Sequence, residues 1–236
     1  MFRILSGGRI RLPWRGTISL ASLFLLIEFV DEFVYGVGGA VMPSLRDEFS
    51  LTYTQVGIFL AVPYIINTFL EPAIMLLGDT RYRKLLVVAG GFLFAAAAAL
   101  FGAAWSFPVL LIASVLTFPA SSAFVSLSQA TLMDLNHGRQ AQMVARWSLA
   151  GTVGNLVGPL LLAGGLALGF GWRWLYLGLA LICLGFVIMG LKKEFPPRSL
   201  RKGRPGEELK DVLRGAWKAV RNLHLLRWIV LLQFSD

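Results

Sequence analysis

Three carboxylates in the first long apolar stretch are the residues of this sequence best suited to chemistry. Glu28, Asp31 and Glu32 occupy positions i, i+3 and i+4 of a helical repeat, and Tyr35 occupies i+7, so all four share one helix face. An ionised acid at the centre of a membrane helix costs about 3 kcal/mol on insertion scales, or roughly 10 kcal/mol for three. We therefore expect this face to line an aqueous cavity, to keep at least one carboxyl protonated, and to bind protons or a cation.

The alternative for this acidic cluster is a structural role, in which hydrogen bonds hold the first helix to its neighbours. No Lys or Arg lies deep within the apolar stretches, away from their ends, to neutralise the acids, and this favours the binding role. Asn67 and Ser121 are further candidates for the cavity wall. Ser121 belongs to a stripe of hydroxyls of the kind that usually serves helix packing (Ser114, Thr117, Ser121, Ser128). Glu71 either acts as a second ionisable relay group or pairs with an Arg at the cytoplasmic edge.

Membrane-spanning helices must position these side chains. Hydrophobic residues make up 56% of the sequence and the mean hydropathy is +0.69. Six apolar stretches of about 18–27 residues are each long enough to cross ~30 Å of hydrocarbon as a helix. They cover residues 17–42, 54–77, 85–104, 107–133, 144–168 and 172–191. The predicted fold is an all-α polytopic membrane protein with a six-helix bundle, in which the short links make neighbouring helices antiparallel.

The basic residues predict the orientation of this bundle. If the helices alternate in direction from a cytoplasmic N-terminus, 20 of the 22 Lys and Arg residues lie on the cytoplasmic side, and Arg46 and Arg173 lie outside. The positive-inside rule then predicts a multi-pass protein of the cell (plasma or inner) membrane. Topology and anionic lipid headgroups account for the net charge of +9, so a nucleic-acid partner is not expected.

Catalytic and metal chemistry find little support in the sequence. One Cys and two His residues leave no basis for a disulfide, a metal site or another cofactor. The metalloprotease motif HExxH and the nucleophile motif GxSxG do not occur. We therefore expect the protein not to be an enzyme.

Composition also divides the chain outside the bundle. Residues 1–16 form a basic cytoplasmic arm, and residues 17–191 form the bundle. Residues 192–222 form a charged central loop with an amphipathic helix that lies on the membrane surface. An apolar run over residues 223–236 rises only about 21 Å as a helix, which is too short to span. We expect it to be the start of a seventh membrane helix, and the chain to be a fragment of a longer protein.

Two motifs carry a resemblance to the major facilitator superfamily. The loop over residues 78–84 resembles the pattern Gly-x-Leu-Ala-Asp-Arg-x-Gly-Arg-Arg/Lys, in which Asp79, Arg83 and Lys84 match. Other residues replace the first Gly, the first Arg and the second Gly of the pattern (Met75, Thr80, Tyr82). The fifth apolar stretch is similar to the antiporter signature of the family at Gly154, Gly158 and Pro159, although the closing glycine pair is displaced by two residues.

One position departs from the family, because Ser114 occurs where the fourth helix often carries an Arg linked to proton transfer. Any proton coupling must then depend on the acids of the first helix. Within the superfamily, residues 29–31, 47–52 and 55–57 look most like the fosmidomycin-resistance type of efflux carrier.

The resemblance implies a fold of two three-helix repeats, a central solute cavity and alternating access. It further implies that Asp79 and Arg83 latch the cytoplasmic side, partly against a missing C-terminal half. The predicted function is secondary active transport, with proton-coupled movement or efflux of a small solute through a twelve-helix protein. The alternative is a membrane scaffold or assembly protein that transports nothing.

Overall fold

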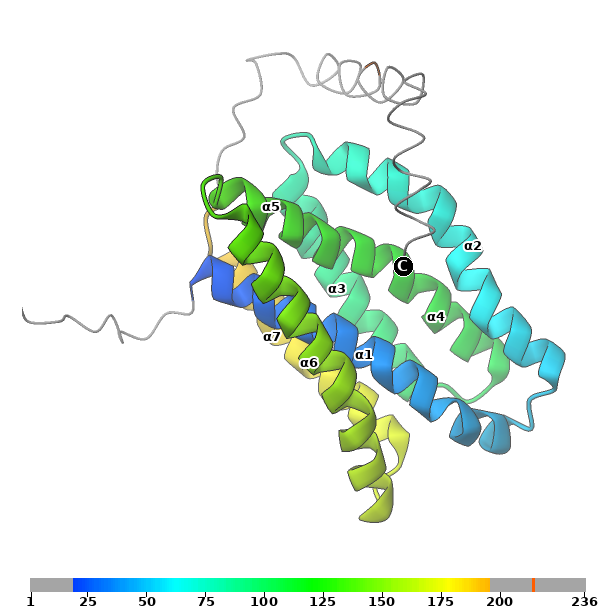
Figure 1. The fold of residues 1–236 in the computed structure, drawn as a ribbon. Helices are drawn as coiled ribbons and strands as arrows, with labels where there is room; N and C mark the ends of the chain where they lie inside the picture. Colours follow the sequence, from blue (N-terminus) through cyan, green and yellow to red (C-terminus); the bar gives the residue numbers. More distant parts are fainter. Residues whose placement is uncertain (1–18, 196–213, 215–236) are drawn as a thin grey trace, which may run out of the picture.

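A computed structural model describes residues 19–195 and Arg214, and these residues form a bundle of helices (Figure 1). No strand occurs among the described residues. The elements are α1 (Leu20–Phe49), α2 (Tyr53–Gly78), α3 (Arg83–Gly102), α4 (Phe107–Ser121), the π-helix η1 (Ser122–Ser126), α5 (Leu127–Leu135), α6 (Gln140–Ala167) and α7 (Trp172–Leu191). The helices α4 and α5 continue each other through η1. The predicted N-terminal arm, the amphipathic helix of the central loop and the start of a seventh helix fall almost wholly outside the described residues.

Local signals fix most helix ends. The Ser19 hydroxyl caps α1 by accepting a hydrogen bond from the backbone N–H of Ser22, and Thr52 forms a capping box with Gln55 at the start of α2. At the other end of α1, Ser50 has a φ of 49° in the left-handed region, which ends the helix. The apolar stretch that ends at residue 42 underestimates α1 because the helix continues for two more turns. Those turns are polar outside, but their Leu45 is fully buried.

Five helical segments are long and apolar enough to cross a membrane by length and composition. They are α2, α3, the segment Phe107–Leu135 that combines α4, η1 and α5, α6 and α7. The remaining helix, α1, has 30 residues, or about 45 Å, but its carboxylates keep it outside this set. The predicted all-helical membrane fold is thus confirmed. The long helix that does not meet the criterion of length and composition is α1, which carries the acids.

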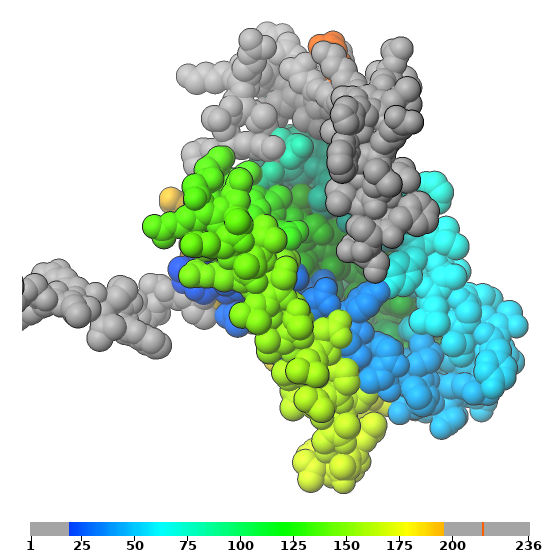
Figure 2. All heavy atoms as spheres, in the orientation of Figure 1, coloured from blue at the N-terminus to red at the C-terminus, as the bar shows by residue number. Residues whose placement is uncertain are grey.

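The bundle is built around α1. It packs most extensively against α6 and also against α7, while α3 packs against α7 and α4, and α2 packs against α4. Apolar side chains of α1 form much of the buried core, among them Phe24, Ile27 and Val37. Figure 2 shows one face of the molecule with α6 and α2 on its two flanks and α1 between them.

Glycines allow the close approach of α6 to α1. A Cβ added at Gly158 would lie 2.6 Å from the backbone oxygen of Phe33, and one added at Gly154 would meet the backbone oxygen of Phe29. Only residues without a side chain permit such backbone contact between membrane helices. The glycine pattern singled out in the sequence therefore sets the spacing of the two helices that carry the acidic cluster and its neighbours.

Candidate functional site: an acidic groove between helices

The three carboxylates of α1 divide between two neighbouring helices. Glu28 is buried and accepts a hydrogen bond from the side chain of Trp147 on α6. One turn further along α1, Glu32 Oε2 accepts a hydrogen bond of 3.1 Å from Asn155 Nδ2 of the same helix. Asp31 instead is hydrogen-bonded to the side chain of Ser121 at the end of α4. The helix face predicted from the spacing is therefore shared between α6 and α4.

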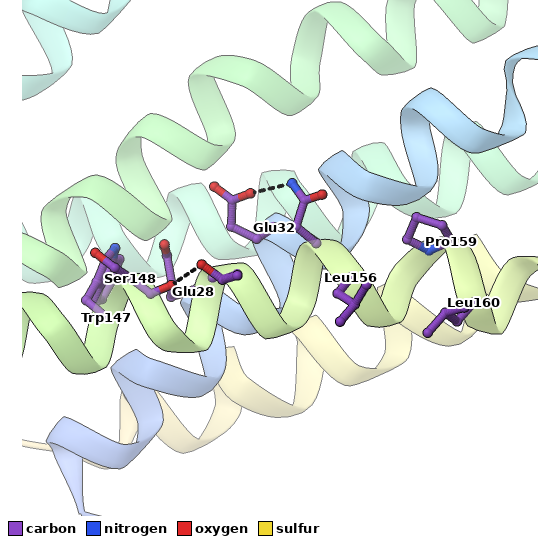
Figure 3. A pocket seen from close by; sticks show the side chains of 10 residues that line it. Glu28, Glu32, Trp147, Ser148, Leu156, Pro159 and Leu160 are labelled. Carbon is purple, nitrogen blue, oxygen red and sulfur yellow. Dashed lines mark hydrogen bonds between the residues drawn. The ribbon is translucent and has the colours of Figure 1, made fainter. Parts of the chain in front are cut away.

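A groove of about 650 Å³ opens beside two of these acids (Figure 3). Glu28 and Glu32 from α1 form one wall, and α6 provides the opposite wall. The α6 residues are Trp147, Ser148, Gly151, Thr152, Asn155, Leu156, Pro159 and Leu160. None of the described residues that line the groove is basic. The groove thus combines carboxylates, an amide and hydroxyls with apolar side chains, a composition suited to protons or to small polar solutes.

Gly151 makes room for one of the acids. A Cβ at this position would lie 2.7 Å from Glu28 Oε1 and 3.0 Å from Glu32 Cγ. Glu28 therefore occupies space that any larger residue on α6 would fill. The glycine repeat of α6 consequently serves two purposes, since Gly151 accommodates a carboxylate while Gly154 and Gly158 accommodate the backbone of α1.

Tyr35 joins the site to α2. It is exposed on α1, and its hydroxyl is hydrogen-bonded to the hydroxyl of Tyr64. The ring of Tyr64 packs edge-on against Phe118 of α4, with 4.5 Å between ring centroids. Tyr35 itself lies one helical turn from Asp31 along α1, on the side away from the helix start.

The other polar candidates differ in the partners that they contact. Within the hydroxyl stripe of the fourth stretch, Ser121 contacts an acid, whereas the Thr117 and Ser128 hydroxyls donate to backbone oxygens of their own helix. The buried Asn67 does not reach α1. Its amide hydrogen-bonds Glu71 and Ser122 instead.

The loop motif forms a charged cluster at the end of the bundle. Arg83 Nη1 donates to Asp134 Oδ2 at 2.6 Å, Nη2 to Asp79 Oδ1 at 3.3 Å, and Nε to the backbone oxygen of Gly78 at 2.7 Å. Lys84 Nζ donates to the backbone oxygens of Leu191 and Lys193 at the end of α7. The matching residues of the motif thus tie the α2–α3 loop to the ends of α5 and α7.

A second charged cluster lies at the opposite end of the bundle. Glu48 accepts hydrogen bonds from Trp172 Nε1 at 2.7 Å and Arg173 Nη2 at 2.6 Å. Arg173 Nη1 also donates to the backbone oxygen of Gly102 at 3.0 Å, so the cluster joins α1, α3 and α7. Desolvation alone would raise the pKa of Glu48, but the hydrogen bonds from Arg173 and Trp172 outweigh it and hold the pKa below its usual value.

Sequence reasoning did not single out several of these partners. Trp147 and Asn155 are polar-tipped residues within an apolar helix, and that feature is the sequence signal that could have indicated them. Asp134 lies at the end of the fourth apolar stretch, on the same predicted side of the membrane as Arg83. No group of His, Cys, Asp and Glu side chains within the described ranges could hold a metal ion.

Membrane-length helices packed around a carboxylate-lined groove define this chain as a polytopic α-helical membrane protein. The family model described as "Major Facilitator Superfamily" matches residues 24–235, and the chain belongs to this family. It is also similar to the fosmidomycin resistance protein of Escherichia coli (strain K12), with 26% identity over 148 residues. That alignment covers 63% of the chain and 35% of the relative, so the chain spans about a third of the relative's length. Both resemblances predicted from the motifs are thereby confirmed.

Proposed function

We propose that this chain is part of a proton-coupled secondary transporter that moves a small solute across the cell membrane by alternating access. Membership of a transporter superfamily supports the class, and the similarity to a fosmidomycin resistance protein supports efflux. The observation that carries the proposal is the position of Glu28 and Glu32 on the wall of a groove that no basic residue lines within the described part of the chain.

In this proposal the carboxylates bind and release the coupling protons. A proton that binds Glu28 removes a negative charge from the groove, and its departure restores that charge, so the affinity of the groove for a solute changes with protonation. Trp147 and Asn155 hold Glu28 and Glu32 in place through the hydrogen bonds described above. Asp31, bound to Ser121, places a third acid where α1 meets α4.

The proposed orientation has the N-terminus in the cytoplasm. The cluster of Asp79, Arg83 and Lys84 then lies on the cytoplasmic side, and the Glu48–Arg173 cluster lies on the opposite side. Alternating access requires these two ends to close in turn around the groove. The ties that Arg83 and Lys84 make to α5 and α7 support a role in holding the cytoplasmic end together.

The experiment uses the intact protein reconstituted in liposomes, with fosmidomycin as the solute and an imposed pH gradient as the driving force. We expect Glu28→Gln and Asp31→Asn each to lower pH-driven transport by about tenfold or more, equivalent to 1.4 kcal/mol. Glu194→Gln is the matched control, because Glu194 is exposed beyond the end of α7. Unchanged pH-driven transport in both Glu28→Gln and Asp31→Asn would exclude these acids as the coupling site.

A further inference from the structure

A second polar cluster, formed by Asn67 and Glu71 of α2 and Ser122 of η1, has no part in the function proposed above. Asn67 Nδ2 donates to Glu71 Oε2 at 3.1 Å and to Ser122 Oγ at 3.2 Å. Ser122 Oγ in turn lies 3.4 Å from Asn67 Oδ1. Asn67 and Ser122 are buried, so the amide holds the carboxyl of Glu71 in a defined position beside the hydroxyl.

The π-helix connects this cluster to the acids of α1. Ser121, the last residue of α4, is hydrogen-bonded to Asp31, and Ser122, the first residue of η1, is hydrogen-bonded to Asn67. Two consecutive residues therefore present one hydroxyl to α1 and one to α2. Single π-turns inside longer helices occur frequently at functional sites, and here the π-turn begins where the two polar clusters meet.

Glu71 lies closer than Asp31 to the end of the bundle that carries the α2–α3 loop. Glu71 lies eight positions before Asp79, a rise of about 12 Å along α2, whereas Asp31 lies about 17 Å from the start of α1. Across residues 19–195 and Arg214, no basic side chain forms an ion pair with Glu71. Among the described residues of α3, α4 and η1, which pack against α2, the ionisable ones are Arg83 and Lys84. Both of these are engaged at the loop and at the end of α7.

We propose that Glu71 is a second proton-binding carboxyl, through which protons pass between the loop end of the bundle and Asp31, and that Asn67 is its positioning residue. A proton that leaves Glu71 leaves a carboxylate there. It is accepted by the carboxylate of Asp31, which becomes a carboxylic acid, and no other bond changes. The proton passes by way of the hydroxyls of Ser122 and Ser121, which are consecutive residues hydrogen-bonded to Asn67 and to Asp31 respectively. This inference rests on the proposed proton coupling at the groove.

The test uses the proton itself as the probe. The intact protein is subjected to a rapid acid jump, and infrared spectroscopy follows the carbonyl stretch of protonated carboxyl groups. Asp31→Asn identifies the component that belongs to Asp31. We expect Glu71→Gln to remove a separate component and to slow protonation of Asp31 by about tenfold, with the Asp31 amplitude unchanged. Ser122→Ala, a smaller change, is expected to slow the same step without removing the Glu71 component.

The outcomes distinguish this inference from the function on which it rests. Spectra and rates of Glu71→Gln that superimpose on those of the unchanged protein would overturn the relay. If Asp31→Asn removes its component at the same time, the proposed coupling site still holds. Absence of any protonated-carboxyl component sensitive to Asp31→Asn or Glu28→Gln would overturn both. Glu194→Gln serves again as the control. We expect it to change the total amplitude of the protonated-carboxyl signal alone, with the rate of Asp31 protonation unchanged.

Discussion

Replacement of single glycines on α6 by alanine provides a quantitative test of the packing between α1 and α6. At Gly158 the added Cβ would lie 2.6 Å from the backbone oxygen of Phe33 and 3.1 Å from Val37 Cγ2. A backbone oxygen inside a helix cannot move aside alone, so the two helices must separate. At Gly164, on the same helix, an added Cβ would meet nothing within 4 Å, which makes Gly164→Ala the matched control.

The expected magnitudes follow from two opposing terms. Alanine in a helix is favoured over glycine by about 1 kcal/mol, and this gain applies to both variants. Overpacking in a close-packed contact costs about 1–3 kcal/mol and applies only to Gly158→Ala. The difference between the two variants therefore isolates the overpacking cost, and Gly158→Ala is expected to be less stable than Gly164→Ala by about 1–3 kcal/mol.

Thermal unfolding of both variants in the same detergent measures this difference. We expect the midpoint temperature to be lower for Gly158→Ala than for the unchanged protein, and equal or higher for Gly164→Ala. Gly154→Ala should behave like Gly158→Ala because its Cβ would meet the backbone of Phe29. Equal midpoints for Gly158→Ala and Gly164→Ala would refute the inference that bare backbone contact sets the distance between α1 and α6.

Two further predictions concern the charged clusters at the ends of the bundle. Arg83→Gln removes the 2.6 Å contact with Asp134 and should lower the free energy of unfolding by about 1–3 kcal/mol. The exposed Lys192→Gln is the control in the same unfolding measurement, and equal losses of stability in the two variants would contradict this prediction. Glu48→Gln should cost about 1 kcal/mol or less near neutral pH, because solvent screens its half-exposed pair with Arg173. The pKa of Glu48 is lowered in the folded state. The stability that the pair contributes is therefore fully present above about pH 4.3, the pKa of Glu in the unfolded chain, and it is lost as the pH falls through the lower pKa of the folded state. A gap between Glu48→Gln and the unchanged protein that persists in strong acid would refute the pairing.

The sequence by itself determined the membrane helices and the presence of an acidic cluster within the first of them. Hydropathy is a local property, so a run of apolar residues predicts a helix wherever its neighbours lie, and the match of 172–191 with α7 shows how well this works. The loop motif was equally local, and it led correctly to the superfamily. The glycines of α6 likewise indicated a close helix contact, although they did not identify the partner helix.

Only the tertiary structure decided which side chains meet the acids. The rotation of each helix about its axis depends on all of its packing contacts at once, and neither loop length nor spacing specifies it. For this reason Glu28 and Glu32 face Trp147 and Asn155, while Asp31, between them in sequence, faces Ser121 on another helix. The π-turn after α4 likewise could not be derived from composition, because one extra residue in a helical turn leaves the apolar pattern almost unchanged.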